Sequence, residues 1–206
     1  MSYRYLLSVD PSLTCSGWAL FALKSGHLKA VGKINSIAAK FPLSVRLQDL
    51  QSKISIIYQE LNLNSKDIVI CESPTTMRDP KAAIKVEQVR SIFETLARGC
   101  GMLVPGRINP RSVQNEILGI KGRQIKRSSV KEIAVDVVCK VYGKHLKEIG
   151  FPLSKENLKK NQDIVDAILI GSLGVARIFS ANQCGVDPAL IFQNSQATRS
   201  GRVMAR

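Results

Sequence analysis

Short apolar runs separated by turn residues open the chain. Three of these runs have the length and β-branched composition of strands: residues 4–9, 18–23 and 28–34. Pro11 and Gly17 bracket the first turn, and Ser25-Gly26 marks the second. The pattern predicts a meander of three strands.

Apolar residues then recur at spacings of three and four over residues 43–61, which predicts an amphipathic helix. Residues 68–71 form a short β-branched run that is typical of a buried, central strand. A second helix is predicted over residues 81–98, because Pro80 is well suited to a first helical turn. Residues 102–105 are expected to form a fifth strand.

The second half of the chain has mainly helical patterns. Helices are predicted over residues 111–118, 128–142 and 162–179. The polar stretch 143–161 contains glycine and proline and is expected to be a loop, and the residues from Ala181 onward a mobile tail. This order predicts an α/β fold with a five-stranded mixed sheet flanked by helices. We expect one domain over residues 1–180 and a basic tail over residues 181–206.

The charge of the chain indicates a polyanionic partner. Lys and Arg number 30 against 16 Asp and Glu, a net charge of +14, which favours nucleic acid over an anionic membrane. No apolar run approaches the roughly 20 residues of a membrane span, and the N-terminus lacks the apolar stretch of a secretory signal. Aromatic residues make up 5% of the chain, so a base-stacking platform is not expected.

The cysteines exclude two further classes of site. There are five, widely scattered, and none forms a Cys-x-x-Cys pair. Neither a zinc knuckle nor a disulfide framework is therefore expected, and the pattern favours a reducing, cytoplasm-like compartment. No feature indicates an organic cofactor or a membrane partner.

Four acidic residues stand where carboxylates can meet at one edge of the predicted sheet: Asp10, Glu72, Asp163 and Asp166. The first two end apolar strands, and the other two open the last long helix. Each has an ordinary alternative: a turn, a cap or an acid favoured by the helix dipole. A chain of net charge +14 gains little from clustering acids unless a cation lies between them, and an unpaired buried carboxylate is costly. The pattern therefore favours a two-metal site that cleaves phosphodiesters.

The stretch from Arg107 to Lys131 is strongly basic, with seven Lys and Arg residues and a single acid, Glu116. Charge runs of this kind are commonly solvated loop surfaces. They are also the side chains that contact phosphates and place a nucleic-acid strand. The net charge of the chain favours the second interpretation.

In order and spacing, these features resemble the RuvC family of Holliday-junction resolvases, within the ribonuclease H-like nuclease superfamily. The resemblance covers roughly residues 4–178. It rests on Val9-Asp10-Pro11 with Gly17, on Ile70-Cys71-Glu72, on Ala83, Lys85, Gln88 and Arg90, on Pro110-Arg111-Ser112-Val113, and on Asp163-Ile164-Val165-Asp166-Ala167.

The resemblance implies a ribonuclease H-like nuclease domain and a homodimeric crossover junction endodeoxyribonuclease. Such an enzyme resolves four-way junctions by paired symmetric nicks that leave 5′-phosphate and 3′-hydroxyl ends. The four acids would hold two Mg²⁺ ions per active site, with Mn²⁺ as a substitute, and Asp10 would bridge them. Whether Asp163 or Asp166 dominates stays open.

The resemblance also implies a set of DNA-binding residues: Met77, Arg78, Lys81, Lys85, Arg111, Arg123, Lys126 and Arg127. Either Lys126 or Arg127 is expected nearest the cleaved phosphate. Where many family members carry an aromatic wedge after the second acid, this chain has Thr75, Thr76 and Met77.

Two other functions remain open from the sequence. The chain could be a nuclease of the same fold that acts on flaps, forks or RNA–DNA hybrids, or a junction-binding protein without catalysis. The longer segments after Gly143 and Ala181 are typical of a divergent member. A cytoplasmic or nucleoid-associated location is expected, with an organelle or a phage-infected cell as alternatives.

Overall fold

The computed structural model describes residues 3–74, 79–120 and 125–197. Its centre is a five-stranded sheet in the order β3-β2-β1-β4-β5. Strands β1 (Tyr5–Asp10), β2 (Cys15–Ala22) and β3 (His27–Asn35) form the predicted antiparallel meander. Strands β4 (Ile68–Glu72) and β5 (Arg107–Ile108) continue the sheet in parallel with β1. The predicted mixed sheet is confirmed.

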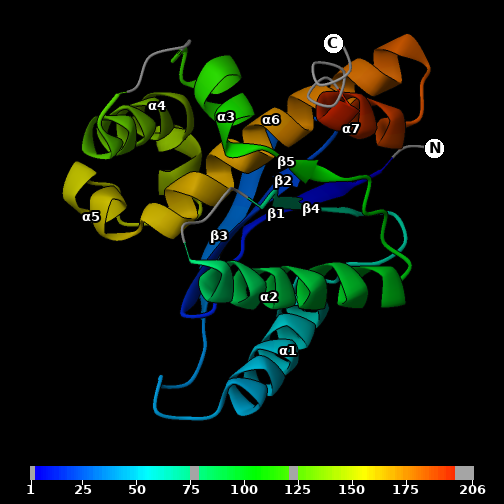
Figure 1. Ribbon diagram of the computed structural model, residues 1–206. Helices are drawn as coiled ribbons and strands as arrows, with labels where there is room; N and C mark the ends of the chain where they lie inside the picture. The colour runs from blue at the N-terminus through cyan, green and yellow to red at the C-terminus, as the bar shows by residue number, and fades with distance from the viewer. Residues whose placement is uncertain (1–2, 75–78, 121–124, 198–206) are drawn as a thin grey trace, which may run out of the picture.

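Helices cover both faces of this sheet (Figure 1). Helices α1 (Leu43–Glu60) and α2 (Pro80–Gly99) lie on one face. The other face carries α3 (Pro110–Ser112), the π-helical turn η1 (Val113–Ile117), α4 (Arg127–Glu148), α5 (Lys155–Lys160), α6 (Gln162–Cys184) and α7 (Pro188–Ala197).

Alternation along the strands divides the core into two layers. Leu6 and Ile70 point into the layer that contains α6, whereas Leu7 and Val69 point into the layer of α1 and α2. Successive side chains of a strand lie on opposite sides of a sheet. A central strand that is buried on both faces therefore needs a nearly continuous apolar run, which β4 shows from Ile68 to Cys71 and β1 shows except at the buried Ser8.

Helix α6 lies directly on β1 and β2 and places its own first turn at one edge of the sheet. Its glycines permit this close approach: a Cβ at Gly171 would lie 2.2 Å from Phe21, and one at Gly174 would lie 2.2 Å from Ile70. The hydroxyl of Ser8 donates a hydrogen bond to the Ala167 carbonyl (2.7 Å). By length and composition α6 could cross a membrane, but 72% of its most apolar window is buried inside the protein, as in the core helix of a folded domain.

The fifth strand begins later than the sequence predicts. The stretch 102–105 contributes only an isolated bridge between Leu103 and Ile68, and the paired strand is Arg107–Ile108. Pro105 interrupts the pairing because it has no N–H to donate to a ladder.

Two predictions for the second half of the chain differ from the structure. The predicted loop 143–161 is wrong, because it contains the end of α4 and the whole of α5. Leu146 and Leu158 bury fully within it, and Ser154 caps α5 by accepting a hydrogen bond from the Asn157 N–H (3.0 Å). Likewise, α6 extends to Cys184 and a further helix, α7, lies within the predicted tail.

Candidate active site

Asp10 and Glu72 lie side by side at the ends of neighbouring parallel strands. Val9 is paired with Cys71 in the ladder between β1 and β4, so the next residue of each strand reaches the same edge of the sheet. The two carboxyls are joined by a hydrogen bond. This arrangement confirms that the two strand ends converge, as the sequence predicts.

The negatively charged carboxylates at this edge of the sheet repel one another. Burial, together with the charges of Glu72, Asp166 and Asp163, raises the pKa of Asp10 well above its ordinary value. Burial and the charge of Asp166 raise the pKa of Glu72 to about 7, against the lowering effects of its hydrogen bond with Asp10 and of Arg90. Two close carboxyls without a cation share a proton in this way.

Asp163 reaches the same edge from the first turn of α6. Gly17, the partner of Asp10 in the β1–β2 ladder, lies directly beneath it. The carboxylate of Asp163 accepts a hydrogen bond from the thiol of Cys15 (3.2 Å) and lies 3.4 Å from the Nζ of Lys33. Both residues are on neighbouring strands, and neither was among the predicted site residues, because nothing in their local sequence marks them.

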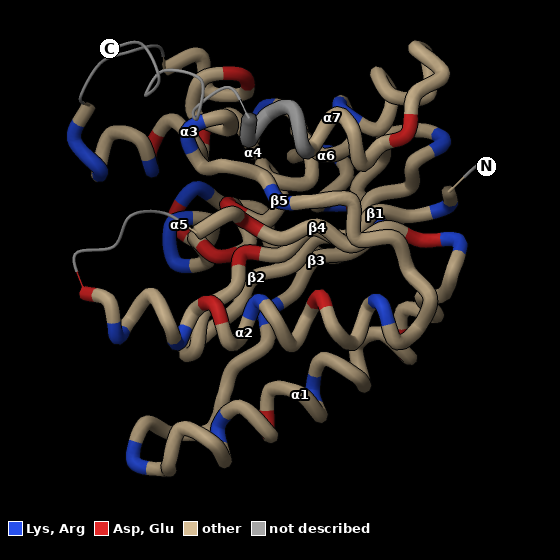
Figure 2. The backbone as a smooth tube through the Cα atoms, turned by 45° about the vertical axis from the view of Figure 1, so that its right-hand side comes forward, with Lys and Arg blue, Asp and Glu red and all other residues tan. Residues whose placement is uncertain are grey.

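Asp166 follows one turn later on α6. Its Oδ1 accepts a hydrogen bond from the Nε2 of Gln162 (3.0 Å). Burial raises its pKa, while the Gln162 hydrogen bond and the positive charges of Lys131 and Arg127 act in the opposite direction. The acids therefore face cations of α4 as well as one another, and acidic positions gather at this end of the sheet in Figure 2.

The chemistry of this cluster fits a hard divalent cation. Its side chains offer carboxylate oxygens, the ligands that Mg²⁺ and Mn²⁺ prefer, and the pKa values of Asp10, Glu72 and Asp166 are raised by burial and by one another's charge in spite of the nearby cations. As the side chains stand, no group of three or more His, Cys or acidic residues in the described ranges is arranged to hold a metal ion. A bound cation would displace the proton between Asp10 and Glu72 and compete with Gln162 and Lys33 for the other two carboxylates.

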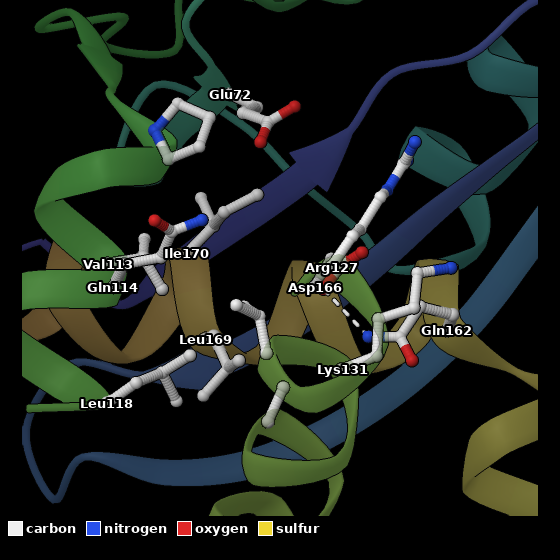
Figure 3. A pocket seen from close by; sticks show the side chains of 13 residues that line it. Glu72, Val113, Gln114, Leu118, Arg127, Lys131, Gln162, Asp166, Leu169 and Ile170 are labelled. Carbon is white, nitrogen blue, oxygen red and sulfur yellow. Dashed lines mark hydrogen bonds between the residues drawn. The ribbon is translucent and has the colours of Figure 1, made fainter. Parts of the chain in front are cut away.

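A cavity of about 190 Å³ adjoins the acids (Figure 3). Glu72 and Asp166 line it together with Arg127 and Lys131, and its remaining wall is largely apolar, with Gln114 of η1 among the polar exceptions. Both cations come from one face of α4, because residues four apart lie above one another on a helix. Lys131 belongs to the basic stretch that the sequence favours as phosphate contacts, although it was not among the individually predicted DNA-binding residues.

The structure places the other predicted DNA-binding residues at several points. Lys81 and Lys85 are exposed on α2, Arg111 is exposed on α3, and Lys126 is exposed immediately before α4. Arg127 lines the cavity, and Lys126 is not part of its lining. The predictions for Met77, Arg78 and Arg123 lie outside the described residues.

Sequence comparison finds two similar proteins of known name, while no protein-family model matches the chain. The crossover junction endodeoxyribonuclease RuvC of Parvibaculum lavamentivorans is 27% identical over 115 residues, which are 55% of this chain and 63% of that protein. RuvC of Erythrobacter litoralis is 25% identical over 119 residues, 57% of this chain and 70% of that protein. The match to the first thus spans less than two thirds of its length.

Comparison with solved structures identifies the fold. The Thermus thermophilus RuvC structure superposes with a TM-score of 0.60 at 16% identity and covers 87% of this chain and 96% of that one. The T. thermophilus RuvC in complex with Holliday junction substrate gives 0.59 at 14% identity, with 88% and 96% covered. The ribonuclease H-like fold and the resemblance to RuvC are confirmed.

Proposed function

We propose that this protein is a metal-dependent endonuclease that resolves four-way DNA junctions. The observation that carries the proposal is the meeting of Asp10 and Glu72 with the two acids of α6 at one edge of the sheet. The similarity to RuvC proteins supports it, because a ribonuclease H-like fold alone hosts several activities. The strongly basic composition supports a nucleic-acid substrate.

In the proposed mechanism Asp10, Glu72, Asp163 and Asp166 would hold two Mg²⁺ ions, for which Mn²⁺ would substitute. Bound cations at such a site lower the pKa of an attacking water and stabilise the leaving 3′ oxygen. The protein's own contribution is to fix these half-buried carboxylates on rigid elements of the fold. Products with 5′-phosphate and 3′-hydroxyl ends, which a ligase can rejoin, are expected.

Arg127 and Lys131 place the substrate strand in this mechanism. Both side chains line the cavity beside Glu72 and Asp166. A DNA phosphate that binds Arg127 and Lys131 would therefore be held next to the carboxylates where cleavage is proposed. Contacts of this kind position a strand without reading its bases. Selectivity is therefore expected to come first from the branched shape of the DNA.

Paired cuts across a junction need two active sites related by two-fold symmetry, so we propose a homodimer. The outer face of α2 supports this proposal. Ile84 is 60% exposed there, and the exposed Lys81 and Lys85 flank it. An exposed apolar side chain on this face is suited to packing against the same helix of a second subunit. The neighbouring lysines are suited to contact the DNA phosphates beside that interface.

The function is tested with a labelled synthetic four-way junction in Mg²⁺, comparing the wild type with Asp10→Asn. Symmetric nicks that ligase can seal are expected from the wild type, and none from the variant. Tight junction binding without cleavage in either Mg²⁺ or Mn²⁺ would contradict the proposal and favour a non-catalytic binding protein. Cleavage of flaps or RNA–DNA hybrids in preference to junctions would identify the other nuclease class.

A further inference from the structure

We propose that Arg90 is a positioning residue for the cation site: it fixes the end of β4 so that the Glu72 carboxylate stays beside Asp10. The proposal rests on the function proposed above, since it concerns the same site. Arg90 lies on α2, 18 positions beyond Glu72, and its hydrogen bond to that residue is made to the backbone carbonyl, not to the carboxylate. Its effect on a bound cation would therefore pass through Glu72.

Arg90 is a buried cation with two specific partners. Only 1% of the residue is exposed, and it ranks among the largest fully buried side chains of the described chain. Its Nε donates a hydrogen bond to the backbone carbonyl of Glu72 (2.6 Å), and its Nη1 forms an ion pair with Glu87. A buried charge is tolerated only when it is paired and hydrogen-bonded, so these two contacts explain why the residue can lie there.

The contact with Glu72 occurs where the strand has few other restraints. Glu72 is the last residue of β4 and is paired with Ile108 of β5. The N–H of the following Ser73 donates to the Ile108 carbonyl (2.7 Å). Arg90 holds the Glu72 carbonyl, so the backbone at the base of this carboxylate is held both by β5 and by α2.

A network of charges anchors Arg90 in turn. Glu87 also pairs with Arg107 of β5 (2.9 Å), and Arg107 makes two hydrogen bonds to Glu94 of α2 (2.6 and 3.0 Å). Arg107 is the ladder partner of Cys71, the residue before Glu72. Two arginines and two glutamates thus join α2 to the ends of β4 and β5.

The chemistry of the contact requires arginine. A guanidinium is a planar fork that can donate to a carbonyl with one nitrogen and to a carboxylate with another, whereas lysine offers a single charged point. Groups that orient metal ligands in this way typically contribute 10- to 100-fold to metal affinity or activity. Arg90 would therefore influence the cation without touching it, and junction binding should depend on it little.

The test compares Arg90→Lys with the wild type and with Arg98→Gln. Arg98 is a matched control because it lies on the same helix and pairs weakly with Glu94 (3.6 Å), but its side chain is 57% exposed. Binding of Mn²⁺ alone is measured by electron paramagnetic resonance of the free ion, without DNA. Junction affinity is measured separately in EDTA, and the cleavage rate as a function of Mg²⁺ concentration.

Arg90→Lys is expected to bind Mn²⁺ about tenfold more weakly or worse, to need correspondingly more Mg²⁺ for half-maximal cleavage, and to keep the wild-type junction affinity. Arg98→Gln should match the wild type in all three measurements. Wild-type Mn²⁺ affinity in folded Arg90→Lys would overturn the proposal, even if the melting temperature fell, because the residue would then be merely structural.

If Arg90→Lys does not fold, Glu87→Gln takes its place, because that change keeps Arg90 and removes the charge that orients it. A smaller loss of Mn²⁺ affinity is expected, and a wild-type affinity would overturn the proposal. The two proposals fail separately. A wild type that cuts no junction would overturn the proposed function. The role of Arg90 would still be decided by Mn²⁺ binding, because that measurement uses no DNA.

Discussion

A Cβ atom at Gly17 would lie 2.0 Å from the carbonyl oxygen of Asp163 and 2.2 Å from its carbonyl carbon. Gly17 is also the ladder partner of Asp10. The absence of a side chain at this position therefore lets the first turn of α6 lie against the sheet, next to the end of β1. The distance between Asp163 and Asp10, and with it the shape of the site, depends on this glycine.

Gly17→Ala is expected to push the first turn of α6 away from the sheet. Overpacking of this kind costs about 1–3 kcal/mol of unfolding free energy, and displacement of Asp163 should lower the cleavage rate by more than that loss of stability explains. Chemical denaturation and junction cleavage check the two effects. Gly99→Ala is the control, because a Cβ there meets nothing within 4 Å. A Gly17→Ala variant with wild-type cleavage would contradict the importance of this approach.

The metal-free protein is expected to lose stability as pH rises from about 5 to about 8. The pKa of Glu72 is raised from 4.5 to about 7, so the folded state holds this proton more tightly than the unfolded state does. The resulting stabilisation is complete below the unfolded pKa and is lost as pH rises through the folded one. A shift of this size corresponds to on the order of 3 kcal/mol.

Thermal melting in EDTA across this pH range measures the effect. Mg²⁺ should raise the melting temperature more at the alkaline end, where the proton between the carboxyls has been lost and a cation can replace it. Asp10→Asn removes the other carboxyl whose pKa is raised in the folded state, so it should flatten the pH dependence and weaken the response to Mg²⁺. A melting temperature that is insensitive to Mg²⁺ at every pH would count against a cation site.

Lys131→Met is expected to shift the pH dependence of cleavage to higher pH. The charge of Lys131 lowers the pKa of Asp166, so its loss raises that pKa further and delays formation of the carboxylate. If Lys131 also contacts a phosphate, the slope of log affinity against log salt concentration should fall by about 1. Lys144→Met, near the other end of α4, should change neither. An unshifted pH–rate profile in Lys131→Met would show that the charge of Lys131 does not affect the pKa of Asp166 during cleavage.

The sequence predicts the convergence of the four acids because each stands at the end of a strongly patterned strand or helix. It cannot predict what surrounds them. Lys33 and Cys15 meet Asp163 only because β2, β3 and α6 pack together, and no local pattern reports such a contact. Arg90 is a buried cation on a helix, where composition alone suggests a solvated charge.

Helix α5 was missed for a related reason. Its residues are mostly polar, and it has a single fully buried position, Leu158. Such a short helix shows too little periodicity to be recognised, and its place is decided by packing against α4 and α6. A longer helix with several buried positions, α1, was predicted with nearly correct bounds, and the start of α6 at Gln162 was predicted correctly although its C-terminal end was not.

Ile84→Glu is expected to convert a dimer into a monomer. The change places a carboxylate on the outer face of α2, where Ile84 is 60% exposed, and burying an unpaired charge in an interface is costly. Light scattering coupled to gel filtration measures the mass, and junction cleavage should change from paired to single nicks, because the two active sites no longer act on one junction. Ile56→Glu is the matched control, since Ile56 is 50% exposed on α1 and should leave the mass unchanged. A wild type that is monomeric at every concentration, with or without a junction, would contradict the dimer and favour a nuclease that cuts one strand at a time.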